Sequence, residues 1–319
     1  MLSVVKSLCE LIEASPPPDA HVSSHWRHHG AKITAQLDGE ALCAQASGFD
    51  TVARPGAGGR LLHLAERWSY RAVTDRLASF PSVWRITRAL LGTLGGGPDF
   101  HAFKSACVVA TLSDHWQACG LRPRLIALIG DGDGLLGVLI RRTLPGAWVY
   151  CIDLPKALAF QAWTHHLADP AAAMAVLADP SGARDTLERD IVFVPPQAIE
   201  AIPGPVDCAI NVASMQEMTR FSIEGYFRFL RRRSGPRSRF YCVNRARKTL
   251  RDGEVNEFAA YPWQPEDEVF LDGPCPYYTH YVAPATTEHG PRVLGLRLPC
   301  INGFEGPVMH RLTRLVPPP

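Results

Sequence analysis

The stretch RLIALIGDGDGLLG, residues 124–137, decides the expected fold of this chain. Residues 124–129 form a short, mostly apolar run between Pro123 and Gly130, which is typical of a strand buried in a parallel sheet. The glycines that follow allow the positive φ angles of a sharp turn and let a ligand approach the backbone closely. The pattern becomes helical over 135–142. A strand, a glycine turn and a helix in this order predict a ligand-binding βα unit.

Strand-like and helix-length segments alternate on the C-terminal side of this unit. Further strands are expected at 148–152, 191–194, 206–212 and 240–243, with helices at 156–167 and 223–233. This alternation predicts right-handed βαβ units and therefore an α/β fold with a mainly parallel, Rossmann-like sheet. Two strand-like runs, 280–283 and 292–298, have no helix between them. We expect these two runs to form an antiparallel pair that closes the sheet.

The N-terminal third has a different texture, with helical periodicity and no strong strand pattern. Val4, Leu8 and Leu11 fall on one face of a helix that ends before Pro16. Amphipathic stretches follow at 61–68 and 90–94, and Gly95-Gly96-Gly97-Pro98 then interrupts the chain. We predict an N-terminal helical cap or oligomerisation region at 1–98 and a ligand-binding domain at 99–319.

Composition excludes some classes of partner. The 319 residues include 33 Lys and Arg against 31 Asp and Glu, a net charge of +2, which gives no support for binding nucleic acid or a membrane surface. No apolar run approaches the length of a membrane span, and the start of the sequence lacks the order of a signal peptide. Nine cysteines without a CxxC pair suit a reducing compartment. We therefore expect a cytoplasmic protein, with a homodimer as one option.

The ligand of the glycine turn follows from its charges. Asp153 ends the next expected strand, about 20 residues further on, where an acid can accept the hydroxyls of a ribose. The spacing Gly132-x-Gly134-x-x-Gly137 leaves a nicotinamide dehydrogenase open, since such a helix start binds a pyrophosphate. Asp131 and Asp133 would repel a pyrophosphate. They suit the sulfonium and ammonium groups of S-adenosylmethionine, which is the favoured cofactor.

Several further strings resemble the class I S-adenosylmethionine-dependent methyltransferases, and among them the sugar O-methyltransferase family. The matching residues are Gly130–Gly134, Ile152–Lys156, Asn211–Met218 with Tyr226 and Phe227, Val243–Arg245, and Tyr261–Trp263. The resemblance covers about residues 100–285, with weaker matches in the N-terminal third, such as His25-Trp26. It implies a methyl transfer from S-adenosylmethionine to a hydroxyl of a sugar or glycosylated small molecule, in secondary metabolism. One departure is Leu128, because the family usually carries an acid two residues before the first glycine.

The strand ends and the resemblance together give the binding candidates. For the cofactor these are Gly130, Asp131, Gly132, Asp133, Asp153, Leu154, Pro195, Asn211 and Ser214. For the acceptor they are Gln216, Asn244, Arg245, Tyr261 and Trp263. Alternative roles stay open: the polar side chains after the fourth strand could cap the next helix, and the aromatic ones could belong to the core.

A sugar hydroxyl is a poor acid, so we expect a catalytic base at the carboxyl edge of the sheet. Glu217 is the first candidate and His280 the second. A carboxylate that stabilises a helix start, and a partly exposed strand histidine, are the corresponding structural alternatives. Some related enzymes use a divalent metal, but no ligand spacing here singles out a set.

Two other functions remain compatible with the sequence. The chain could be an N- or O-methyltransferase for a peptide or another natural product, since one fold accepts many acceptors. It could also be a non-catalytic relative that binds the cofactor, which the missing acid at Leu128 permits.

Overall fold

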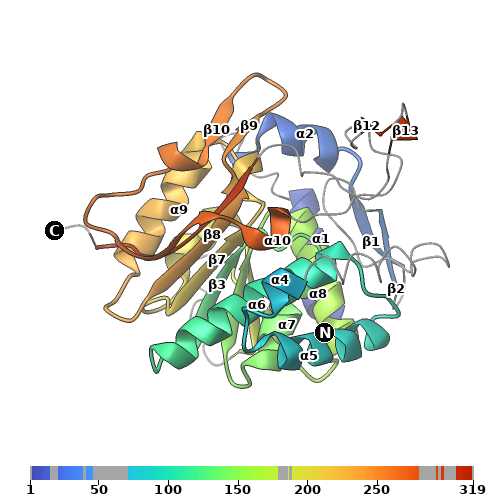
Figure 1. Ribbon diagram of the computed structural model, residues 1–319. Coiled ribbons are helices and arrows are strands. Elements are labelled where there is room, and N and C mark those ends of the chain that lie inside the picture. The colour runs from blue at the N-terminus through green and yellow to red at the C-terminus, as the bar shows by residue number, and fades with distance from the viewer. Residues whose placement is uncertain are drawn as a thin grey trace.

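A mainly parallel eight-stranded sheet lies at the centre of the molecule (Figure 1). The computed structural model describes residues 2–14, 21–38, 41–45, 71–178, 186, 189–279, 292–293, 296–297 and 307–317. The parallel strands are β3 (Leu125–Ile129), β4 (Trp148–Ile152), β5 (Met174–Val176), β6 (Ile191–Val194), β7 (Cys208–Val212) and β8 (Arg239–Arg245). The spatial order is β11-β14-β8-β7-β3-β4-β6-β5, which confirms the Rossmann-like α/β fold.

An antiparallel pair closes the sheet, but its strands are not the expected ones. The pair is β11 (Glu268–Pro274) and β14 (Val308–Arg314), and β14 lies antiparallel to β8. The expected placement of this pair at 280–283 and 292–298 was therefore wrong. Residues 280–283 lie outside the described residues, while β12 (Arg292–Val293) and β13 (Leu296–Arg297) pair only with each other.

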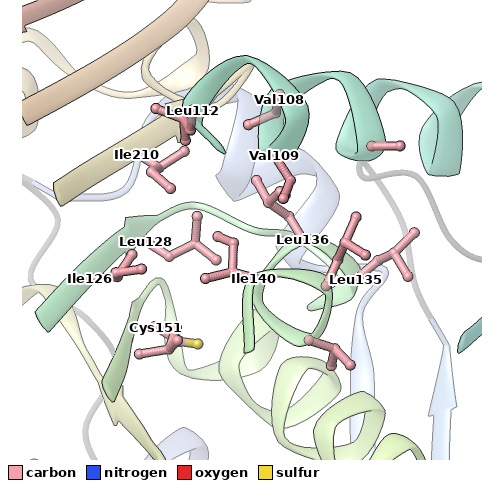
Figure 2. Close-up of a cluster of buried hydrophobic side chains, with 14 of the residues drawn as sticks. Val108, Val109, Leu112, Ile126, Leu128, Leu135, Leu136, Ile140, Cys151 and Ile210 are labelled. Carbon is pink, nitrogen blue, oxygen red and sulfur yellow. The ribbon is translucent and has the colours of Figure 1, made fainter. Parts of the chain in front are cut away.

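Helices cover both faces of the sheet. Successive residues of a strand point to opposite faces, so an apolar strand places buried side chains on both. Ile126 and Leu128 of β3 join a core with α6 (Phe100–Ala118) and α7 (Leu135–Thr143). Figure 2 shows this packing, with Leu112 of α6 and Ile140 of α7 close to the strand. The intervening residue Ala127 joins the second core, on the side of α9 (Arg220–Arg232). Burial on both faces explains the unbroken apolar run of β3.

The N-terminal segments precede α6, and several of their helices pack on the same core. They are α1 (Leu2–Ala14), α2 (Ser24–Gly30), β1 (Thr34–Asp38), β2 (Ala41–Gln45), α4 (Arg71–Thr74) and α5 (Phe80–Thr93). Val5 and Leu8 are buried in the cluster that contains Leu128, and α1 packs against α8 (Pro155–Ala168). We expected no strands in this third of the chain. That expectation was wrong, because β1 and β2 form an antiparallel pair. The amphipathic stretch at 61–68 lies outside the described residues.

Short elements complete the carboxyl edge of the sheet and the segment after β8. They are the 3-10 helices η3 (Pro196–Ala201), η4 (Met215–Glu217) and η5 (Phe258–Ala260), the strands β9 (Arg247–Thr249) and β10 (Val255–Glu257), and α10 (Pro276–Thr279). Within the described ranges, no helix has both the length and the apolar character required to cross a bilayer.

The core around β3 predicts the effect of one truncation. Leu128 is 1% exposed, so Leu128→Ala should lower the free energy of unfolding by about 2–5 kcal/mol through lost apolar contact and a residual cavity. Leu167→Ala is the matched control, because Leu167 is 43% exposed and the change should cost well under 1 kcal/mol. Urea unfolding measures both. Equal losses in the two variants would contradict this account of the core.

Candidate functional site

The carboxyl ends of β3 and β7 form the point where the order of the strands reverses. From β3 the chain proceeds to β4 and β6 on one side, and then returns to place β7 on the other side of β3. Helical connections leave such a point in opposite directions, and ligands of open α/β sheets bind in the crevice that results. The glycine turn after β3 and the polar segment after β7 both lie there.

The glycine turn brings the two strand ends into direct contact. Gly130 has a φ of +71°, and a Cβ added to it would lie 1.8 Å from the Ser214 side-chain oxygen. Only a residue without a side chain fits that space and that backbone conformation. Gly132 and Gly134 also have positive φ, at 66° and 91°. The backbone of the turn therefore runs close to its neighbours, with Gly130 against Ser214 and Gly134 against Gln161.

Asp131 is directed into the protein and holds the start of α7. Its Oδ1 accepts a hydrogen bond from the Leu136 amide at 3.2 Å, and its Oδ2 accepts one from the Gly137 amide at 2.8 Å. Burial, together with the charge of Asp133, raises the pKa of Asp131 to about 8. Because the carboxyl group already occupies these two amides, a pyrophosphate could not use them. This geometry disfavours the dehydrogenase alternative.

Asp133 differs from Asp131 in having a buried oxygen without a partner. Its Oδ1 lies 3.0 Å from His101 Nε2 and accepts a hydrogen bond from the Leu135 amide at 3.1 Å. Its Oδ2 is buried and has no hydrogen-bond partner among the described residues. A buried carboxylate oxygen without a partner is costly. The site therefore fits a ligand that brings a positive charge or a donor to this oxygen.

Asp153 stands at the end of β4, beside the turn. Its Oδ1 accepts a hydrogen bond from the Leu154 amide and its Oδ2 accepts one from Gln161 Nε2, each at 2.8 Å. Burial raises its pKa to about 6. Its carboxyl group also accepts a hydrogen bond from the Gly132 amide. The side chain is only partly buried, and a carboxylate has about four acceptor positions, so one more donor can be accepted. Asp153 can thus accept a hydroxyl donor while Gln161 fixes its orientation.

Two buried amides join the ends of three strands. Asn211 at the end of β7 donates to the Ile129 carbonyl of β3 at 2.9 Å, and Asn244 of β8 donates to Asn211 Oδ1 at 2.8 Å. Asn244 Oδ1 accepts from the Gln216 amide, and Gln216 Oε1 accepts from the Arg245 amide. Asn211, Asn244 and Gln216 are at most 3% exposed. In this structure their amides brace the crevice.

The segment between Asn211 and Ser214 carries backbone strain. Ala213 has a φ of +57°, a left-handed conformation that no other non-glycine residue of the described chain adopts. Such strain costs about 1–3 kcal/mol and concentrates at functional sites. It places the partly exposed Ser214 against Gly130.

Glu217, the expected base, has two partners that the sequence did not suggest. Its Oε1 lies 2.6 Å from Lys248 Nζ, and its Oε2 lies 3.2 Å from His25 Nε2. Burial acts to raise the pKa of Glu217, but the hydrogen bond from His25 and the charge of Lys248 outweigh burial and lower it. Glu217 is consequently ionised at neutral pH and has a low affinity for a proton.

The remaining candidates have varied positions. Leu154 and Pro195 follow β4 and β6 at the carboxyl edge. Tyr261 and Trp263 instead pack in the core with Phe227. The structure does not bring these two rings to Asp153 or Glu217 by any contact within the described part of the chain. His280 lies outside the described residues. Lys248, His101 and Gln161 were missed, since none belongs to a motif that periodicity can detect, and His25 was noted only as part of the N-terminal resemblance.

The described ranges contain no group of three His, Cys, Asp or Glu side chains that could hold a metal ion.

Comparisons with known proteins concern the fold alone. No protein-family model matches the sequence, and no curated protein matches it. One similar solved structure is magnesium protoporphyrin IX methyltransferase from Synechocystis PCC 6803 with bound SAH, at 12% identity over 77% of this chain and 99% of that chain, with a TM-score of 0.38. Another is the mitomycin 7-O-methyltransferase MmcR, at 15% identity over 80% of this chain and 68% of that chain, with a TM-score of 0.36.

A third similar structure is TrmN from Thermus thermophilus, at 12% identity over 65% of this chain, with a TM-score of 0.36. This chain spans about half of its length, 49%. All three likenesses are distant, so function has to be argued from the residues of the site.

The contact between Gly130 and Ser214 predicts a sharp sensitivity to a single methyl group. Gly130→Ala should lower the free energy of unfolding by at least about 2 kcal/mol, because it combines a positive φ with a collision against Ser214. Gly225→Ala, within α9 and with nothing inside 4 Å of the added carbon, should instead stabilise by about 0.5–1 kcal/mol. Thermal unfolding of both variants tests this, and a tolerated Gly130→Ala would show that the turn is wider than described.

The raised pKa of Asp131 predicts a pH dependence of stability. Its value is about 8 in the folded chain against a reference of 3.8, so the folded state binds the extra proton between about pH 4 and pH 8. The contribution of Asp131 to the free energy of unfolding is fully present below about pH 4. It is lost as the pH rises to 8, by at most about 1.4 kcal/mol per pH unit.

Asp131→Asn removes this titration, so its unfolding free energy should fall less steeply over the same pH range. Urea unfolding at several pH values measures the difference. Parallel slopes for the wild type and Asp131→Asn would contradict the assignment.

Proposed function

We propose that this protein is an S-adenosylmethionine-dependent O-methyltransferase that acts on a hydroxyl of a sugar or a glycosylated small molecule. The observation that carries the proposal is the glycine turn at the reversal of strand order, which carries the buried Asp133, whose Oδ2 has no hydrogen-bond partner among the described residues, and has the partly exposed Asp153 beside it. A ligand with a cationic end and a ribose fits both carboxyl groups.

Each part of the cofactor has a candidate partner. Asp153 would accept a ribose hydroxyl, with Gln161 holding its orientation. Asp133 would receive the cationic methionine end, and so take the place of the acid that the family usually has at the position of Leu128. Ser214 lies beside the turn, where its hydroxyl could bind the same end. When bound, S-adenosylmethionine supplies a methyl group made electrophilic by the sulfonium.

The acceptor would bind beside the loops after β7 and β8. Glu217, Lys248 and Arg245 lie there and are only partly buried, so polar and charged groups border this part of the edge. Polar surroundings suit a hydroxylated acceptor better than a wholly apolar one. The sugar class itself rests on the sequence resemblance, as does a place in natural product biosynthesis.

Calorimetry of the purified protein with S-adenosylmethionine tests the cofactor assignment. We expect binding, and Asp153→Asn should weaken it about ten-fold or more because a charged acceptor of a hydroxyl donor is lost. Asp190→Asn is the matched control, since Asp190 precedes β6 at the opposite edge of the sheet and should leave affinity unchanged. Absence of binding to the wild-type protein would refute both the enzyme and the cofactor.

Mass spectrometry of an acceptor panel then tests the reaction. Methyl glycosides, nucleotide sugars, phenols and short peptides are each incubated with the protein and S-adenosylmethionine. A gain of one methyl group on a glycoside or sugar supports the proposed acceptor class. Methylation of a peptide or phenol alone would favour the alternative N- or O-methyltransferase, and cofactor binding without any product would favour the non-catalytic relative.

A further inference from the structure

The N-terminal helix α2 lies across the carboxyl edge of the sheet, beside β9 and β10 (Figure 1). Ser23, which caps α2, donates to the Glu217 carbonyl at 2.5 Å. Lys156, after β4, donates to the Gly30 carbonyl at the other end of α2 at 2.7 Å. The helix is therefore fixed to the loops after two different strands, on either side of β3.

This docking brings His25 to Glu217. The His25 side chain is 15% exposed, the Glu217 side chain is 14% exposed, and Nε2 and Oε2 lie 3.2 Å apart. Lys248 contacts the other oxygen of the same carboxylate. A carboxylate that a hydrogen bond from His25 and the charge of Lys248 keep ionised is a weak base, but it can orient a neutral imidazole and stabilise that ring once it gains a proton.

We propose that His25 is the catalytic base of the reaction and that Glu217 is its positioning residue. This inference rests on the proposed function. With a proton on Nε2 directed at Glu217, the lone pair of the ring lies on Nδ1. In the reaction Nδ1 takes the proton of the acceptor hydroxyl while the acceptor oxygen forms a bond to the methyl carbon. The methyl–sulfur bond breaks and its electron pair stays on sulfur, so the sulfonium becomes a neutral thioether and the ring becomes an imidazolium.

The surroundings of His25 favour this division of roles. On α2 its ring lies 4.5 Å from that of His29, and His28 is the next histidine. Lys248 of β9 contacts the same Glu217 carboxylate, and Arg251 and Lys32 act on the neighbouring His28 and His29. Asp252 lies beside Ser24 and Arg27 of the same helix. The Glu217 carboxylate beside the ring would stabilise the imidazolium that the transfer forms.

Kinetics of the intact protein test the proposal, with S-adenosylmethionine and whichever glycoside or sugar of the panel is methylated. His25→Gln should lower kcat about a hundred-fold or more, while leaving the calorimetric affinity for S-adenosylmethionine and the thermal midpoint close to those of the wild type. His28→Gln, on the same helix, is the matched control and should retain activity. The acid limb of the kcat/KM profile against pH should disappear in His25→Gln and persist in His28→Gln.

Two further variants separate a base from a structural role. His25→Ala should regain part of its activity when imidazole is added, which a residue that only holds α2 in place would not allow. Glu217→Gln should lower kcat less than His25→Gln does, and the double variant should be no worse than His25→Gln alone, because Glu217 acts through His25.

The outcomes distinguish this inference from the function on which it rests. Turnover by the wild type together with less than a three-fold loss in His25→Gln would overturn the base and leave the methyltransferase standing. A large loss without rescue by imidazole and with an intact acid limb would assign His25 a structural role. Binding of S-adenosylmethionine without turnover of any acceptor would overturn the reaction and the base together.

Discussion

The whole site depends on the absence of a side chain at Gly130. The space that its Cβ would fill is occupied by Ser214, so the end of β3 and the segment after β7 lie in contact. This contact sets the position of the glycine turn that follows. It also explains why the strand end after β7 carries strain at Ala213, because the chain must bend there to meet the turn.

The two aspartates of the turn have the same sequence environment and different tasks. Both carboxyl oxygens of Asp131 accept hydrogen bonds from amides in the first turn of α7, so Asp131 has a structural role. Asp133 shares one oxygen with His101 and keeps the other without a partner. Low local dielectric makes both arrangements energetically significant, since it raises the pKa of the first and penalises the unpaired oxygen of the second.

The sequence predicted the strand, turn and helix around Gly130, and the acid at Asp153, because these features are local and periodic. The prediction of strands from sequence failed for β14, because the buried polar residues His310 and Thr313 interrupt the apolar alternation of that strand. His310 is accommodated by Tyr241, 3.1 Å away on the neighbouring strand, which no local pattern reveals. The β1 and β2 pair could have been found, since Asp38-Gly39 is a turn signal between two short strand-length runs.

The contact between His25 and Glu217 could not be predicted in this way, because tertiary packing brings together two residues that are far apart in the sequence. The roles of Asp131 and Asp133 were likewise indistinguishable until their partners were known.

A crystal structure of the protein with S-adenosylhomocysteine tests the central claim most directly. The account predicts a ribose hydroxyl within hydrogen-bond distance of Asp153 and the ammonium beside Asp133 Oδ2, with Asp131 still bound to the amides of α7. A ligand found elsewhere on the molecule, or one whose ammonium avoids Asp133, would contradict it.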